Sequence, residues 1–155
     1  MVDIEHLNGV IVQAKQASYV GDGRPILSSR PGSHDLAWQA GDWRYLDSYF
    51  GGTDFIGQEV IWHLGKPVWA MNYYGYVLRP DLIDAQRAGQ TIKSALSSLY
   101  THHQRFLGGF EWHGPHGAYI DTNSGDAARF SGRETISVEG QTAYALDYCG
   151  GLIKP

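Results

Sequence analysis

Two glutamates at matching positions in two similar segments are the residues of this chain best suited to do chemistry. Glu59 and Glu134 each follow a phenylalanine and a glycine at the same spacing, Phe-x-Gly-x-Glu. The interior of a β-strand disfavours glutamate, so its presence at both places needs a reason. A carboxylate in an aromatic cleft can bind a cationic ligand, or its pKa can rise until it serves as a general acid or base. The alternative is a structural glutamate that accepts backbone N–H bonds or pairs with Arg44 or Arg133.

Both glutamates belong to an internal repeat with a period of 75 residues. Residues 55–78 and 130–153 align without a gap, and eight of the 24 positions are identical. The repeat predicts two pseudo-symmetric halves, at about 1–78 and 79–155, that pack around a pseudo-two-fold axis. A cleft between such halves is a common place for a ligand. Two hairpins that share only β composition and turn chemistry are the alternative.

Hydrophobic periodicity, helix caps and the positions of glycine and proline predict the helices and strands that position these residues. Asp3 caps a first helix, and a second helix opens at Pro80-Asp81 and runs to about Tyr100. Loops are expected over 21–33 and 107–117, where glycine and proline gather. The predicted strands are 34–39, 43–50, 55–64, 67–78, 118–121, 128–138 and 142–152. Together they predict one α+β domain over 1–155, an antiparallel sheet with two helices on one face.

The turn chemistry predicts which side chains share a face of the sheet. A type II′ turn at Gly65-Lys66 places Glu59 opposite Asn72, and the repeat then places Glu134 opposite Asp147. One face is mixed aromatic and polar, as in ligand pockets: Phe55, Glu59, Ile61, His63, Asn72, Tyr74 and Tyr76, with Arg44 or Leu46 adjacent. The other is apolar and expected beneath the helices: Trp43, Tyr45, Val60, Trp62, Leu64, Trp69, Met71 and Val77. Asp47 falls on this apolar face as a structural hydrogen-bond acceptor.

The mixed face supplies most of the predicted ligand-binding residues. The full set is Glu59, Asn72, Tyr74, Phe55, His63, Arg44, Glu134, Asp147, Trp112 and His113. The last two lie in the predicted loop 107–117. A homodimer interface and a solvent face are the alternative interpretations of this surface.

Several function classes find no support in the residues. The net charge of −4 leaves no excess of lysine and arginine for nucleic acid or an anionic membrane. Cys149 is the one cysteine, which excludes internal disulfides and zinc-finger frameworks. Phosphate-binding glycine loops and a nucleophile elbow are missing, and His113-Gly-Pro-His116 is a weak chelator. We therefore expect no cofactor, no metal site, no membrane span and a cytoplasmic location.

Four short segments resemble a bacterial domain of unknown function, numbered 5680. They are Tyr45-x-Asp47-Ser-Tyr-Phe-Gly-Gly52, Phe55-x-Gly-x-Glu59, Pro67-Val-Trp-x-Met-Asn-Tyr-Tyr-Gly75 and Phe130-x-Gly-x-Glu134. The resemblance runs from the first helix to Gly151. Because such domains occur alone or behind an Xre-type helix-turn-helix, it implies a sensing or partner-binding role. It implies no reaction.

Three function hypotheses follow. The first is a non-catalytic domain that binds a small molecule of unknown identity in an aromatic and acidic cleft between the halves. The second is a hydrolase or isomerase that uses Glu59, or the pair Glu134 and Asp147, as general acid and base. The third is a protein-interaction module anchored by an exposed Trp112.

Overall fold

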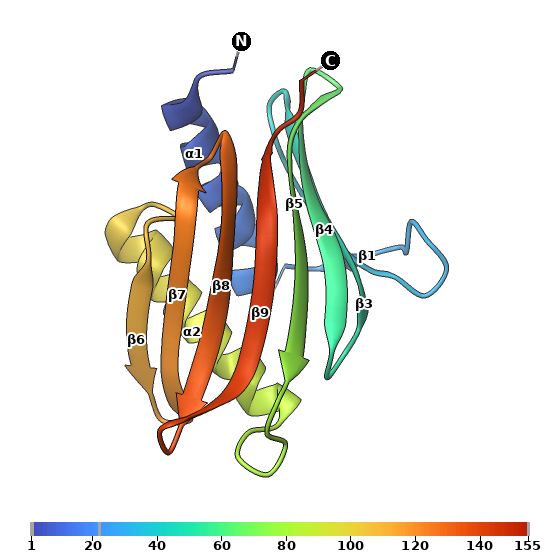
Figure 1. Cartoon of the computed structure of the whole chain (residues 1–155). Coiled ribbons are helices and arrows are strands. Elements are labelled where there is room, and N and C mark those ends of the chain that lie inside the picture. Colours follow the sequence, from blue (N-terminus) through green and yellow to red (C-terminus); the bar gives the residue numbers. More distant parts are fainter. Residues whose placement is uncertain (1, 22, 155) are drawn as a thin grey trace.

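The computed structural model describes residues 2–21 and 23–154, in which a nine-stranded antiparallel sheet carries two α-helices on one face (Figure 1). The spatial order of the strands is β1-β2-β3-β4-β5-β9-β8-β7-β6. The predicted α+β class, antiparallel sheet and one-sided helices are confirmed. In chain order the elements are α1 (Ile4–Lys15), η1 (Gln16–Val20), β1 (Pro25–Ile26), β2 (His34–Ala40), β3 (Trp43–Gly51), β4 (Phe55–His63), β5 (Lys66–Val77), α2 (Ala85–His103), β6 (Phe110–Gly114), β7 (Gly117–Asp126), β8 (Arg129–Val138) and β9 (Gln141–Leu152).

Both helices begin at an aspartate that caps them. Asp3 accepts a hydrogen bond from the backbone N–H of His6, as the sequence predicted, and Asp84 accepts one from Arg87. The second helix therefore starts later than the expected Pro80-Asp81, because a turn closed on the carbonyl of Arg79 precedes it. α1 continues without a break into one π-helical turn, η1.

The hairpin turns differ from the prediction and change the register. The central residues of the β4–β5 turn are Leu64 and Gly65, both with positive φ, so the turn lies one residue earlier than Gly65-Lys66. This alone would move the pairing by two residues and leave each side chain on its predicted face. A β-bulge between Ile61 and Trp62 adds one residue, and a one-residue slip reverses the faces. Glu59 consequently lies opposite Met71 rather than Asn72.

The same pair of irregularities occurs in the second hairpin. The β8–β9 turn has Glu139 and Gly140 at its centre, both with positive φ, and the register shifts between Ile136 and Ser137. Glu134 therefore pairs with Leu146, and the predicted pairing of Glu134 with Asp147 is wrong. Asp147 pairs with Arg133 and projects from the opposite face.

Each observed face of the sheet therefore mixes residues that the sequence assigned to the mixed face with residues that it assigned to the apolar face. The helix-covered face carries side chains from both: Tyr45, Asp47, Phe55, Glu59, Ile61, Trp69, Met71 and Tyr73. Asn72 and Tyr74 are exposed on the other face, where Tyr74 retains 45 % of its accessible surface. The predicted mixed pocket face is therefore wrong as a set.

The segment expected as the loop 107–117 contains a strand. β6 pairs with β7 at the edge of the sheet, and its inward side chains, including Trp112, pack on the core. The sequence obscured it because glycines and a proline surround it. An alternating burial pattern in a five-residue edge strand leaves little periodicity to detect.

Two glycines let tyrosine rings lie flat across the neighbouring strand. A Cβ on Gly57 would lie 2.5 Å from the hydroxyl of Tyr73, and a Cβ on Gly132 would lie 2.2 Å from the ring of Tyr148. These glycines sit opposite those tyrosines in the ladder. Their missing side chains are therefore what allows each tyrosine to cross toward β3 or β7.

We expect Gly132→Ala to lower the free energy of unfolding by about 1–3 kcal/mol, because the added methyl displaces the Tyr148 ring. Gly9→Ala is the matched control, since a Cβ at Gly9 in α1 meets nothing within 4 Å. That control should stabilise the protein by about 0.5–1 kcal/mol. Urea unfolding measures both, and equal effects would contradict the packing argument.

Candidate functional site

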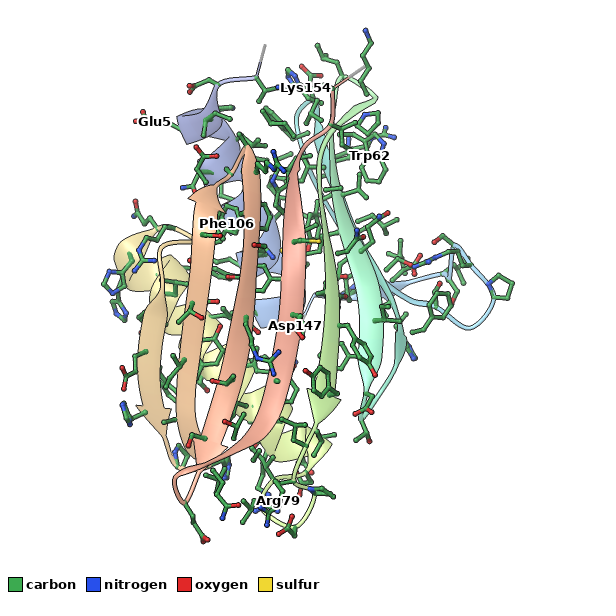
Figure 2. The ribbon with its side chains drawn as sticks, in the orientation of Figure 1. Glu5, Trp62, Arg79, Phe106, Asp147 and Lys154 are labelled. Atoms are coloured by element: carbon green, nitrogen blue, oxygen red, sulfur yellow. The ribbon has the colours of Figure 1, made fainter. Side chains whose placement is uncertain are left out.

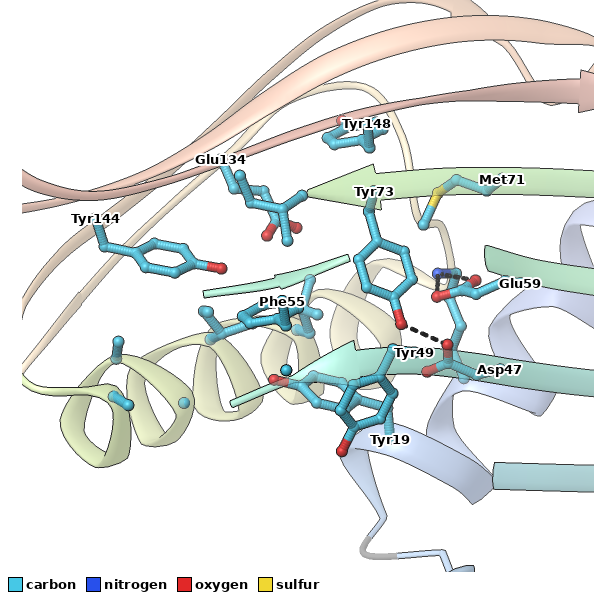
Figure 3. A pocket seen from close by; sticks show the side chains of 18 of the residues that line it. Tyr19, Asp47, Tyr49, Phe55, Glu59, Met71, Tyr73, Glu134, Tyr144 and Tyr148 are labelled. Carbon is cyan, nitrogen blue, oxygen red and sulfur yellow. Dashed lines mark hydrogen bonds and ion pairs between the residues drawn. The ribbon is translucent and has the colours of Figure 1, made fainter. Parts of the chain in front are cut away.

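A cavity of about 240 Å³ lies between the sheet and the helices (Figure 3). Its lining comes from β3, β4, β5, β8 and β9 on one side and from α1, η1 and α2 on the other. Aromatic and aliphatic side chains form most of the wall, and four charged groups project into it. These groups are Lys15, Asp47, Glu59 and Glu134. The composition fits a pocket for an organic molecule, which needs apolar walls and a few placed polar groups.

A buried ion pair joins the last turn of α1 to the sheet. The Nζ of Lys15 lies 2.8 Å from Oε1 of Glu59 and 2.6 Å from Oε2, and each residue is only 6 % exposed. The pair fixes the helix over β4. It also identifies Glu59 as a structural partner of Lys15, whereas the sequence had offered Arg44 or Arg133.

Asp47 occupies the position beside Glu59 on the neighbouring strand. The Tyr73 hydroxyl donates a 2.5 Å hydrogen bond to Oδ1 of Asp47, which is 3 % exposed. Burial and then the charge of Glu59 raise the pKa of Asp47 to about 7, while the Tyr73 hydrogen bond and Lys15 act in the opposite direction. The predicted acceptor role of Asp47 is confirmed, and the carboxyl also faces the cavity.

Glu134 brings a second carboxyl of the same kind. Its Oε1 accepts a 2.8 Å hydrogen bond from the Tyr119 hydroxyl. Burial and then the charge of Asp121 raise the pKa of Glu134 to about 7. Asp121 itself lies outside the cavity lining and accepts a 2.7 Å hydrogen bond from the hydroxyl of Tyr148.

One tyrosine hydroxyl in the wall of the cavity has no protein partner. Tyr144 is 1 % exposed, and among residues 2–21 and 23–154 its hydroxyl has no hydrogen-bond partner. The hydroxyl lies against β5, where a Cβ on Gly75 would be 2.6 Å away, and Figure 3 shows it beside Phe55. A buried hydroxyl without a partner destabilises a fold, so this group lowers the stability of the wall.

The cavity opens where a strand turn meets the start of α2. Gly51, Gly52 and Thr53 form the exposed turn between β3 and β4, and Ala85 and Gly89 of α2 line the opposite side. A Cβ on Gly89 would meet no atom within 4 Å, so this glycine leaves open space. Glycine inside a helix costs roughly 1 kcal/mol relative to alanine, which indicates that the space itself is useful.

The predicted ligand-binding residues divide between this cavity and other places. Phe55, Glu59 and Glu134 line it. Asn72, Tyr74 and Asp147 lie on the far face, around a shallow hollow of the sheet. Figure 2 shows Asp147 on β9 on this face. There Asn72 accepts a hydrogen bond from Gln58, and Asp147 forms an ion pair with Arg133 at 2.8 Å.

The four remaining predicted residues are held elsewhere. His63 ends β4 and stacks on Trp43 with ring centroids 4.2 Å apart, and Arg44 is exposed opposite Trp62. Trp112 is half-buried against the core, whereas the interaction hypothesis expected it to be exposed. His113 is exposed, and its Nε2 lies 2.8 Å from Oε1 of Glu111.

Several cavity residues were not in the predicted set. The prediction missed four of them as site residues: Lys15, Asp47, Tyr73 and Tyr144. For the three strand residues, the assumed register assigned the side chain to the core or left it unassigned. A signal was available for Lys15, since a lysine on the apolar side of the first helix implies a buried carboxylate partner. Within the described part of the chain, no group of three or more histidine, cysteine or acidic residues has metal-site geometry.

The fold and the pocket define a class, an α+β protein with a helix-covered ligand-sized cavity in an antiparallel sheet. The chain belongs to the family described as domain of unknown function (DUF5680), whose model matches residues 47–153. The resemblance found in the sequence is thereby confirmed. Comparisons with curated proteins and with solved structures returned no match. No described helix is long and apolar enough to cross a membrane.

We expect Lys15→Met to lower the free energy of unfolding by about 3–5 kcal/mol, because it leaves the Glu59 carboxylate buried without its cation. The double variant Lys15→Met/Glu59→Gln should recover most of that loss, since no unpaired charge then remains. Urea unfolding of the single and double variants tests the pair. A Lys15→Met cost below about 1 kcal/mol would mean that the pair contributes little.

Stability should also depend on the pH through Asp47 and Glu134. Because folding raises both pKa values, the folded protein binds more protons than the unfolded chain between about pH 4 and 7. The stability that these groups contribute is complete below about pH 4 and is lost as the pH rises through about 7. Between pH 5 and 8 we expect each group to lose about 2–3 kcal/mol, which makes about 5 kcal/mol for the two in the wild type.

The variants Glu134→Gln and Asp47→Asn should each reduce that pH dependence, because an amide does not titrate. Urea unfolding at pH 5 and pH 8 measures the difference for each protein. Parallel pH profiles in wild type and both variants would contradict the assignment.

Proposed function

We propose that the protein binds a small organic molecule in the cavity between the sheet and the helices. The observation behind the proposal is a partly open cavity of about 240 Å³ with aromatic walls, in which a few polar groups converge. Most protein interiors are packed without voids larger than a water molecule, so a hollow of this size within a helix-covered core is unusual. The proposal keeps the first hypothesis from the sequence and moves its site beneath the helices.

We further propose that the chain consists of two pseudo-symmetric halves that share this cavity. The support is a set of features that recur 74 or 75 residues apart, in the turns, the bulges and the pairs of tyrosine with aspartate. β5 and β9 meet at the middle of the sheet, so the two predicted hairpins are direct neighbours. An alignment of relatives that conserves both members of each pair would test the repeat.

The pKa values of Asp47 and Glu134 support acid–base catalysis as a second candidate function. A general acid or base works best when its pKa lies near the working pH, and both carboxyls approach 7. The alternative pair of Glu134 and Asp147 is excluded by its geometry, because the two side chains lie on opposite faces of the sheet. A reaction abolished by Asp47→Asn while ligand binding persists would favour the enzyme.

Gly89 provides a direct test of binding. We expect Gly89→Leu to fill the mouth of the cavity and to weaken ligand binding at least tenfold, because its side chain enters space that is empty in the wild type. The control Gly89→Ala should retain binding and gain about 0.5–1 kcal/mol of stability.

Native mass spectrometry of gently purified protein should show a retained small mass that Gly89→Leu loses and Gly89→Ala keeps. Ligand-observed NMR with a library of small aromatic compounds gives a second measurement. Equal binding by wild type and Gly89→Leu would mean that the ligands bind outside the cavity.

A further inference from the structure

We propose that the natural ligand is an organic cation with an apolar body, and that the carboxyls of the cavity bind its positive group. The inference rests on the proposed function and specifies its ligand class. Three observations carry it: the charge balance of the lining, the partners of each charged group and the aromatic walls.

The charged groups that line the cavity are unequal in number. Three carboxyls, those of Asp47, Glu59 and Glu134, face one ammonium group, that of Lys15. Lys15 is engaged with both oxygens of Glu59. Among the described residues, neither Asp47 nor Glu134 has a cation within ion-pair distance, and each accepts one tyrosine hydroxyl instead. The cavity therefore lacks one or two positive charges, which a cationic ligand would provide.

The groups around the two carboxyls reinforce this imbalance. The charged groups near Asp47 are two acids, Glu59 and Asp35, and one cation, Lys15. The Tyr73 hydroxyl donates a hydrogen bond to Asp47. The charged groups near Glu134 are two acids, Asp121 and Glu59, and again Lys15 as the cation. The Tyr119 hydroxyl donates a hydrogen bond to Glu134. One lysine thus serves the surroundings of both carboxyls, and an added cation would lower the free energy of ionising each of them.

The cavity walls suit a cation in their shape and polarity. Tyrosine and phenylalanine rings surround the space, and the faces of such rings attract ammonium groups by a cation–π interaction that strengthens when water is excluded. The rings are those of Tyr19, Tyr49, Phe55, Tyr73, Tyr100, Phe106, Tyr144 and Tyr148.

An anionic ligand fits this arrangement poorly. Among the described residues of the lining, Lys15 is its only cationic partner, and binding would have to displace Glu59 from two contacts of 2.8 Å or less. The anion would also face the carboxyls of Asp47 and Glu134. A neutral apolar ligand would fill the space and leave both carboxyls in a desolvated site without a counter-charge.

Three probes of the same size separate these classes. Benzyltrimethylammonium carries a fixed positive charge, neopentylbenzene is its neutral isostere, and phenylmethanesulfonate is an anion of similar shape. Isothermal titration calorimetry and ligand-observed NMR with the full chain should show that the cation binds at least tenfold more tightly than either of the others. Gly89→Leu should remove that binding, which would place it in the cavity.

The carboxyl variants test which groups attract the charge. Glu134→Gln and Asp47→Asn should each weaken binding of benzyltrimethylammonium at least fivefold. Asp147→Asn removes a carboxyl from the far face of the sheet and should leave the affinity within twofold of wild type. Circular dichroism of each variant confirms folding before binding is measured, and either of the two cavity variants suffices for the test.

A pH series gives an independent readout. Protons compete with the cation for the two carboxyls, so affinity should rise by at least fivefold from pH 6 to pH 8 and binding should release protons. Neopentylbenzene should bind equally at both pH values.

The outcomes distinguish the two proposals. Equal binding of the cation and its neutral isostere, both lost in Gly89→Leu, would overturn the cationic ligand and keep the cavity as a binding site. Cation affinity unchanged in both carboxyl variants would also overturn it. Wild-type protein that binds none of the three probes would overturn it as well, while the retained-mass experiment decides the proposed function separately.

Discussion

The structure depends on a one-residue bulge placed near the turn of each long hairpin. Because side chains alternate along a strand, the extra residue moves Glu59 and Tyr73 together onto the face beneath the helices. The corresponding bulge in the second hairpin does the same for Glu134 and Tyr148. Without the bulges, the partners of these residues would point away from the helices, and the acids would face a different set of neighbours.

Three carboxyls lie beneath the helices, and a lysine neutralises only one of them. Lys15 neutralises Glu59, and tyrosine hydroxyls satisfy Asp47 and Glu134 without neutralising them. Burial, reinforced by the charge of a neighbouring carboxyl, raises the pKa of Asp47 and of Glu134 to about 7. Hydrogen bonds from tyrosines lower the free-energy cost of burying these two carboxyls in a site with little water.

Glycines shape the cavity as much as the larger residues do. Gly57 and Gly132 give room for tyrosine rings to cross to the next strand, where their hydroxyls reach buried aspartates. Gly89 leaves space at the mouth at the expense of helix stability. The fold therefore combines close packing around the tyrosines with an open volume beside α2.

The sequence alone determined the helices, most strands, the α+β class and the family resemblance. These follow from local signals such as the Asp3 cap, alternation along strands and the Phe-x-Gly-x-Glu spacing. Only the tertiary structure decided the cavity, the Lys15–Glu59 pair and the separation of Glu134 from Asp147. The reason is that a bulge has no reliable local signature, yet one extra residue reverses every face beyond it. Contacts between residues as distant as Lys15 and Glu59 depend on that register and on how the helices pack over it.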